Sequence, residues 1–143
     1  MTLLVIHLVA TAMMAGLIWF VQVVHYPLFD VVGAEQSVQY AHEHQRRTSY
    51  VVGAPMAVEG VTALALFFRP PSDLGSVWPF VGLVLLGIVH ASTVFLQVPQ
   101  HARLAQAHDP ARVRFLVRTN WIRTIGWTAR AVLAAFLVVA GAQ

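Results

Sequence analysis

The sequence contains no cysteine and no lysine, and only 10% of its 143 residues are charged. Without cysteine, disulfides, thiolate metal sites, iron–sulfur clusters and cysteine nucleophiles are all excluded. The nine basic residues are therefore all arginines. They are spread over predicted loops and helix ends instead of forming a dense basic patch, which argues against a nucleic-acid-binding protein.

Long hydrophobic runs account for most of the chain, of which 58% is hydrophobic. A helix that crosses a bilayer needs roughly 20 mostly apolar residues. Four such runs are present, at about residues 3–24, 47–68, 78–100 and 115–140. We therefore predict an all-α fold, a polytopic membrane four-helix bundle that forms a single integral membrane domain over residues 1–143. Pro27 is expected to end the first helix, and Pro55 to kink the second.

The arginines are distributed unequally between the two sides of the predicted bundle. The connection after the second helix contains only Arg69. Cytoplasmic loops of membrane proteins carry an excess of basic residues, so both long loops are predicted to be cytoplasmic and both termini to lie outside, in what we expect to be a bacterial inner membrane. The arginines in or beside those two loops are Arg46, Arg47, Arg103, Arg112, Arg114 and Arg118.

Two short segments recur in the two halves of the chain. Phe20-Val-Gln-Val in the first helix resembles Phe95-Leu-Gln-Val in the third, and Arg47-Thr-Ser-Tyr-Val resembles Arg118-Thr-Asn-Trp-Ile. This repeat suggests two helical hairpins related by a pseudo-twofold axis along the membrane normal. Short hydrophobic repeats also arise by chance in helices, and chance similarity is the alternative.

Polar residues recur at helical spacing in each predicted helix and so form one polar face per helix. A charged side chain that faces lipid costs about 2.5–3.5 kcal/mol on insertion scales, so these faces are expected to point into the bundle. The residues concerned are His7, Gln22 and His25 in the first helix, Thr48 and Glu59 in the second, His90, Gln97 and His101 in the third, and Asn120, Arg123 and Arg130 in the fourth.

Depth divides these residues into two layers. Near the cytoplasmic ends lie the candidate catalytic residues His25, Gln97, His101, Asn120 and Arg123. Deeper in the membrane, Glu59 and Arg130 are predicted to lie at the same height. We interpret them as a structural ion pair because neither charge is stable alone in hydrocarbon, and a role in proton or substrate binding is the alternative.

Seven histidines are many for a chain of this length. His25, His90 and His101 are predicted to lie on interior faces, and imidazole is the commonest metal ligand, so they are candidate cofactor-binding residues for a haem or a metal. The sequence contains no HExxH or ExxH motif, however. A site without a cofactor and a site with histidine-bound haem or metal therefore both stay open.

The other histidines and several aromatic residues are interpreted less specifically. His42, His44 and His108 lie in or near predicted loops, where solvation is the expected state, although the depth of His44 also places it with the cytoplasmic layer. Trp19, Trp78 and Tyr26 are expected to be anchors at the membrane interface.

The end of the third helix, Gln97-Val98-Pro99-Gln100-His101, and the start of the fourth, Thr119-Asn120-Trp121-Ile122-Arg123, resemble the anthrone-oxygenase-like family of small four-helix membrane proteins. The resemblance covers the second half of the chain. It implies oxidation of phenolic anthrone-type polyketides to quinones by dioxygen without a dedicated cofactor, with Pro99, Asn120, Trp121 and Arg123 at the matching positions. His101 stands where the family usually has asparagine.

These features favour a membrane-embedded, oxygenase-like oxidoreductase that acts on a lipophilic aromatic or quinone-like small molecule. His101 or His25 would remove a proton from the substrate, while Gln97, Asn120 and Arg123 would hold the resulting oxyanion. One alternative is a haem- or metal-binding membrane redox protein. The other is a non-enzymatic transporter or membrane-complex subunit, and transport through so small a bundle would require a homo-oligomer.

Overall fold

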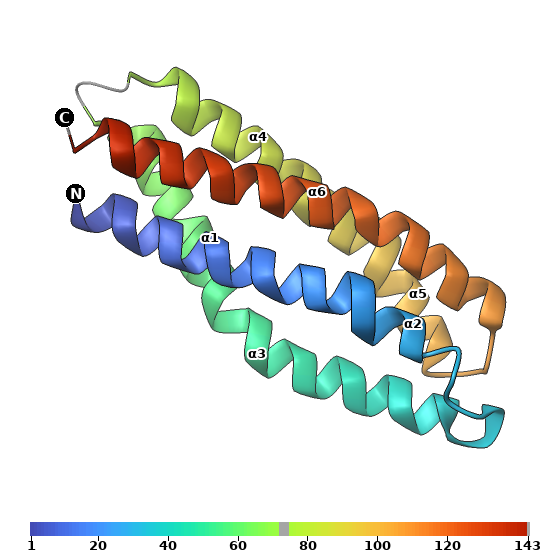
Figure 1. Cartoon of the computed structure of the whole chain (residues 1–143). Helices are drawn as coiled ribbons and strands as arrows, with labels where there is room; N and C mark the ends of the chain where they lie inside the picture. The colour runs from blue at the N-terminus through green and yellow to red at the C-terminus, as the bar shows by residue number, and fades with distance from the viewer. Residues whose placement is uncertain (72–74, 143) are drawn as a thin grey trace.

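The structure is a computed structural model, and it describes residues 1–71 and 75–142. In these ranges it contains helices and no strands, which confirms the all-α four-helix bundle (Figure 1). Each of the four long helical segments is long and apolar enough to cross a membrane. In chain order they are α1 (Thr2–Phe20) with η1 (Val21–His25) and α2 (Tyr26–Leu28), then α3 (Ala34–Phe68), then α4 (Val77–Ser92) with η2 (Thr93–Gln97) and α5 (Val98–Leu104), and finally α6 (Pro110–Ala140).

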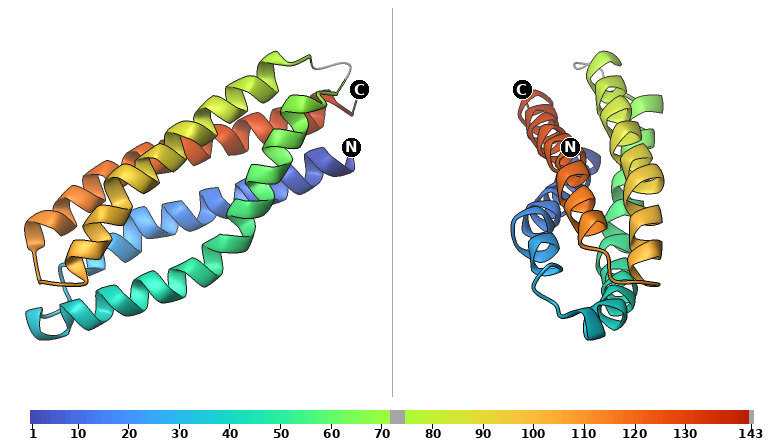
Figure 2. Two further views of the ribbon diagram at one scale, coloured as in Figure 1. Left: turned by 180° about the vertical axis from the view of Figure 1, so that it is seen from behind. Right: turned by 90° about the vertical axis from the view of Figure 1, so that its right-hand side faces the viewer.

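Neighbouring segments run antiparallel, so the bundle has two distinct ends (Figure 1). The N-terminus and the C-terminal part of α6 lie at one end, the termini end. The connections at residues 29–33 and 105–109 lie at the other, which we call the loop end (Figure 2). Part of the turn predicted at residues 69–76 falls on residues 72–74, which lie outside the described residues.

At the loop end the helices extend further than their hydrophobic runs predict. α3 begins at Ala34 and not near residue 47, and α6 begins at Pro110. The Asp109 side chain accepts hydrogen bonds from the Ala111 and Arg112 amides, and the following proline fits the first helical position, so both residues define this start. At about 1.5 Å per residue α3 is roughly 50 Å long, well beyond a hydrocarbon core of about 30 Å. The long loop predicted between the first two helices is therefore mostly the first turns of α3.

The prediction that Pro27 ends the first helix is wrong. The helix widens into the π-helical turn η1 and then passes through Pro27 to Leu28. A proline clashes with the carbonyl group four residues earlier, and a wider turn relieves that clash. η2 precedes Pro99 in the third segment in the same way. Pro55 lies inside α3, and α3 visibly changes direction along its length, as expected for a proline kink (Figure 2).

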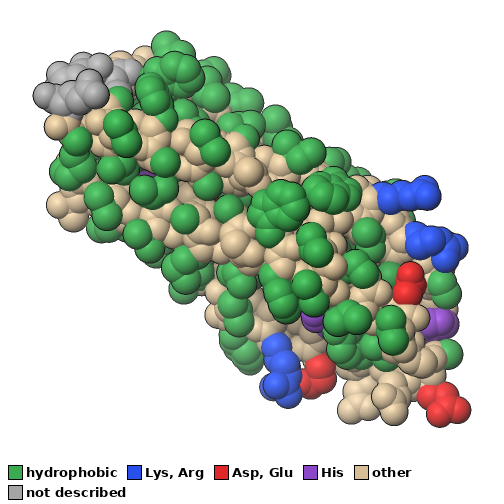
Figure 3. All heavy atoms as spheres, viewed as in Figure 1, with side chains coloured by type: hydrophobic (Ala, Val, Ile, Leu, Met, Phe, Trp, Pro, Cys, Tyr) green, Lys and Arg blue, Asp and Glu red, His purple; other side chains and the backbone are tan. Residues whose placement is uncertain are grey.

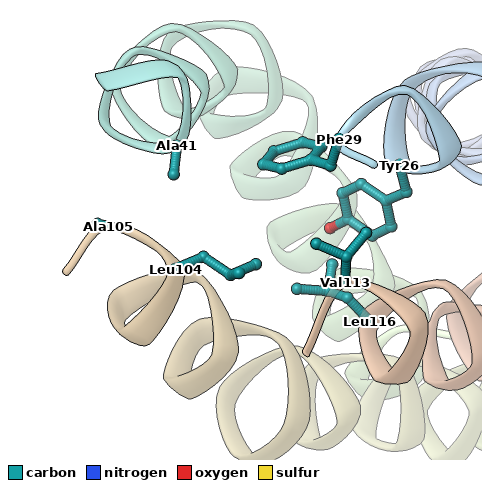
Figure 4. Close-up of a cluster of buried hydrophobic side chains, with 7 residues drawn as sticks. All are labelled: Tyr26, Phe29, Ala41, Leu104, Ala105, Val113 and Leu116. Atoms are coloured by element: carbon teal, nitrogen blue, oxygen red, sulfur yellow. The ribbon is translucent and has the colours of Figure 1, made fainter. Parts of the chain in front are cut away.

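The helices pack as a four-sided bundle in which α1 contacts α3 and α6, and α4 also contacts α3 and α6. α3 and α6 are therefore diagonal partners. At the loop end the core is a cluster of apolar side chains contributed by all four segments (Figure 4). Met14, Ile18, Val89 and Trp127 form a second cluster, and Leu4, Leu66 and Leu137 a third.

The outer surface has the opposite character to that of a soluble protein. Hydrophobic side chains are spread along the whole face in Figure 3, and the charged side chains visible there gather toward the loop end. Large apolar side chains such as Phe95 and Val61 are exposed, whereas Glu59, Asn120 and Arg130 are almost completely buried. This inverted distribution indicates an integral membrane protein.

Gly126 marks the closest approach between α4 and α6. A Cβ atom at this position would lie 2.5 Å from Cγ2 of Val89, which is itself buried. Gly126→Ala should therefore destabilise the protein by about 1–3 kcal/mol through overpacking, although alanine favours helix more than glycine does. The measurement is the free energy of unfolding in mixed micelles.

Gly87→Ala in α4 is the matched control, since no atom lies within 4 Å of a Cβ at that position. The free energy of unfolding of this variant should equal that of the wild-type protein or be slightly higher. A Gly126→Ala protein as stable as the Gly87→Ala protein would contradict the close contact. Adding Val89→Ala to Gly126→Ala should restore part of the lost stability.

Candidate functional site

A pocket of about 340 Å³ lies at the loop end, between α3 and the η2–α5 part of the third segment. All four helical segments contribute polar side chains to it. Its apolar lining includes Val52, Met56 and Val98. Its polar lining includes Gln45, Thr48, Ser49 and Thr93, together with five residues here called the pocket residues: Tyr26, His44, Gln97, His101 and Arg123.

Two histidines and one tyrosine meet in this pocket. The hydroxyl group of Tyr26 and Nε2 of His101 are hydrogen-bonded at 2.9 Å, and both residues are buried. The imidazole rings of His44 and His101 lie 4.9 Å apart, centroid to centroid. His44 is also hydrogen-bonded through Nδ1 to Nε2 of His25 at 2.5 Å. The pocket thus holds two imidazoles, and a third lies directly behind His44.

Arg123 is held by a chain of buried amides that begins in the first segment. Its Nη1 donates to Asn120 Oδ1 (3.1 Å), and Asn120 Nδ2 donates to Gln22 Oε1 (2.9 Å). Gln22 Nε2 in turn donates to the carbonyl group of Val117 (3.1 Å). The guanidinium group also lies 5.3 Å above the ring of Trp127. These contacts fix the direction of the only cationic side chain that lines the pocket.

Gln97 is almost completely buried and is held from both sides. Its Nε2 donates to Thr119 Oγ1 (3.1 Å), and its Oε1 accepts from Ser92 Oγ (3.2 Å). Because both ends of the amide are already bonded, Gln97 is suited to shape the pocket wall rather than to receive a ligand.

Two pocket residues have buried nitrogen atoms without partners. Among the described residues, neither Nδ1 of His101 nor Nε of Arg123 makes a hydrogen bond. A buried polar atom without a partner carries a desolvation penalty of about 1–3 kcal/mol, so such atoms call for a bound group. Both belong to side chains that line the pocket, although the two nitrogen atoms themselves are covered by neighbouring atoms.

The structure separates two histidines that the sequence analysis grouped with His101. His25 is half-buried and lies behind His44, outside the pocket. His90 is also half-buried, its Nδ1 is bonded to the carbonyl group of Leu86, and its ring lies near Trp127. The predicted set of His25, His90 and His101 therefore does not converge.

The π-helical turns explain this separation. A uniform α-helix would place His90, Gln97 and His101 on one face, but η2 inserts an extra residue and turns the chain that follows it by about 100°. Gln97 and His101 consequently face the interior of the bundle, while His90 lies outside the pocket, half-buried beside Trp127. η1 acts in the same way on the first segment, where Tyr26 becomes buried and His25 is displaced from the buried face that contains His7.

Within residues 1–71 and 75–142, no three histidine, aspartate or glutamate side chains are arranged so that they could hold a metal ion. This finding concerns metal ions held by three such side chains and does not bear on a haem held by two histidines. Two of the histidines are already hydrogen-bonded to each other.

The deeper polar layer is a separate centre. Arg130 Nε donates to Glu59 Oε1 (2.7 Å), Trp127 Nε1 donates to Glu59 Oε2 (2.9 Å), and Arg130 Nη1 donates to the carbonyl group of Gly82. The structure thus brings together the two residues predicted to pair, and their contact crosses the bundle diagonal from α3 to α6. The adjoining cavity holds only about 10 Å³, room for about one water molecule.

Sequence reasoning underestimated two pocket residues, His44 and Tyr26. His44 was assigned to a loop, although Ala41, His44, Thr48 and Glu59 fall on one helical face and could have revealed a longer helix. Tyr26 was expected at the membrane interface and is instead 3% exposed, packed against the loop-end cluster (Figure 4).

Comparisons of this chain with protein-family models, with curated proteins and with solved structures find no match.

Proposed function

We propose that the chain is a membrane-embedded, oxygenase-like oxidoreductase that acts on a lipophilic aromatic or quinone-like small molecule in the loop-end pocket. The observation that supports this most directly is the pair of buried, unpartnered nitrogen atoms on His101 and Arg123, in a pocket that also contains a second imidazole. The proposed reaction is that of the family which the second half of the sequence resembles.

His101 and Arg123 are suited to bind an oxyanion. If the Tyr26 hydroxyl group donates to His101 Nε2, the His101 proton is on Nδ1, the atom without a partner. In the proposed complex, these side chains turn toward the substrate, and Nδ1–H of His101 and Nε–H of Arg123 donate to one of its oxygen atoms. Donors fixed in a site with little water stabilise developing negative charge strongly, and Asn120 keeps Arg123 in place.

His44 is the proposed general base. It lines the pocket, and its Nδ1 is already hydrogen-bonded, so Nε2 is the atom available to a substrate. A neutral imidazole suits the removal of a phenolic or benzylic proton. The electron-rich anion would then react with dioxygen. For a substrate methylene group, one oxygen atom enters the new carbonyl group and the other leaves as water, so no additional reductant is required.

Arg123→Leu tests the oxyanion site. The loss of a charge-assisted donor should weaken binding of a phenol such as 1-naphthol by about 1.5–3 kcal/mol, and should weaken naphthalene binding much less. Binding can be measured by fluorescence titration of the purified protein in lipid nanodiscs. Arg118→Leu is the matched control, because Arg118 lies on the same helix but is exposed.

The proposal requires that the wild-type protein bind 1-naphthol more tightly than naphthalene. This difference in affinity should disappear in Arg123→Leu and persist in Arg118→Leu. If wild-type protein bound both compounds equally, or neither of them, the pocket would not be an oxyanion-binding site for aromatic substrates.

We further propose that the loop end is cytoplasmic, because most of the arginines gather there. Since the chain has no cysteine, single cysteines can report the orientation. Gln106→Cys at the loop end should resist a membrane-impermeant maleimide in intact cells and react after lysis, whereas Ser76→Cys at the other end should react in intact cells. Both positions are exposed. The opposite labelling pattern would reverse the topology.

A further inference from the structure

A second pocket, of about 190 Å³, lies on the other side of α3, between that helix and the end of the first segment. It is lined by His25 and Arg47 and by apolar residues such as Phe20 and Val51. Thr48 and Val52 line both pockets, so this part of α3 is the wall between them. We call this second pocket the rear pocket.

A pair of histidines crosses this wall. His44 lines the first pocket and His25 lines the rear pocket. Nδ1 of His44 and Nε2 of His25 lie 2.5 Å apart, and Thr48 Oγ1 lies 3.1 Å from the same Nδ1. Each ring therefore uses one nitrogen for the contact and has its other nitrogen available on its own side of the wall.

Aromatic side chains hold His25 in this position. Its ring packs edge-on against Phe29 at 5.5 Å and lies 6.0 Å from Tyr40, centroid to centroid. An imidazole that only filled space here would not need to be aligned nitrogen to nitrogen with a second imidazole. The alignment is what proton transfer between two rings requires.

We propose that His44 and His25 form a proton wire that carries a proton from the substrate pocket through the α3 wall to the rear pocket. The inference rests on the proposed function, because it needs a substrate that releases a proton to His44. It adds a role for His25, which does not touch the substrate and acts through His44.

The transfers balance at each atom. The substrate O–H or C–H bond breaks and its proton binds Nε2 of His44. The proton on Nδ1 of His44 moves to Nε2 of His25, and the proton on Nδ1 of His25 passes to water beside the exposed Arg47 side chain at the edge of the rear pocket. Each ring gains one proton and loses one, so both stay neutral, and the reverse sequence returns a proton to the product and restores the starting tautomers.

The surrounding charges favour transfer in this direction. Arg123 is on the substrate side, and its positive charge opposes the accumulation of a second positive charge there. On the rear side, the Arg47 guanidinium group is paired with Glu43 (2.8 Å), and Arg46 binds the same carboxylate. These three side chains leave a net charge of +1 on the rear side, but they are largely exposed, so water screens that charge more than it screens Arg123.

The wire can be tested with 2-naphthol, a lipophilic phenol that becomes a much stronger acid on excitation, so that proton loss appears as naphtholate emission. Full-length protein in lipid nanodiscs would be loaded with 2-naphthol, and the naphtholate share of the emission measured. The key variant is His25→Gln, whose side-chain carbonyl can still accept a hydrogen bond from His44 but cannot pass on a proton. His42→Gln, at an exposed position of the same helix, is the control.

In wild-type protein and in His42→Gln the naphtholate share should be equal. In His25→Gln and in His44→Gln it should fall by about tenfold, because a proton that cannot leave returns to the naphtholate before emission. If 2-naphthol bound to His25→Gln and gave the same naphtholate share as in wild type, the proton wire would be wrong. The proposed substrate pocket would not be contradicted by that result. If 2-naphthol did not bind the wild-type protein, the proposed function would fail and the wire with it.

Discussion

Arg130→Met should destabilise the protein by about 3–5 kcal/mol, the cost of leaving a buried charge without its partner. Glu59 is fully buried, and in the variant it would keep only the Trp127 N–H group as a donor. The site lies between the diagonal helices α3 and α6, and the cavity beside it has room for about one water molecule, so water can compensate only in part. The measurement is the free energy of unfolding in mixed micelles at neutral pH.

The double variant Glu59→Gln/Arg130→Met tests whether the loss of stability comes from the unpaired charge. With both charges removed, most of the lost stability should return, because a buried pair contributes little net energy compared with neutral residues of similar size. Arg118→Met, at an exposed position of α6, should have almost no effect. If Arg130→Met lowered the free energy of unfolding by less than about 1 kcal/mol, water would have to reach the Glu59 carboxylate.

His44→Phe should reduce turnover of an aromatic substrate by about 10²–10⁴-fold, the usual contribution of a general base. Phenylalanine fills a similar volume, so the affinity for the substrate should change little. The measurement is oxygen consumption by nanodisc-embedded protein, first screened against lipophilic phenols to find a substrate, with binding followed in parallel by fluorescence.

His42→Phe controls for a change of ring at a neighbouring position of α3, since His42 is exposed. A His44→Phe protein that turned over substrate like the wild type would assign the base to another group, and His101 would be the first to examine. If His44→Phe lost both substrate binding and turnover, His44 would instead contribute mainly to the shape of the pocket.

Much of the fold could be predicted from hydropathy and helical spacing. The four apolar runs are long, and the cost of exposing polar groups to lipid forces Glu59, Asn120 and Arg130 inward. Depth counted from the helix ends placed Glu59 level with Arg130, and the two side chains meet. These predictions succeeded because each depends on one strong energetic term and on a regular helix.

The site was harder to predict because the helix is irregular where the site forms. Spacing arguments assume 3.6 residues per turn, and η1 and η2 break that period immediately before Tyr26 and His101. His44 was missed for another reason. The first turns of α3 are polar, and hydropathy cannot distinguish a helix that emerges from the membrane from a loop.

The two π-helical turns also divide the molecule into parts that can vary separately. On the termini side, a regular helical register holds the ion pair of Glu59 and Arg130. On the loop side, the register is reset, and it is this second register that brings Tyr26 and His101 together. Removing one residue from η1 would rotate Tyr26, and removing one from η2 would rotate His101. His44, Arg123 and the ion pair lie on α3 and α6 and would stay where they are. New ligand preferences could therefore arise in one half of the bundle without loss of the contact that joins α3 to α6 in the other.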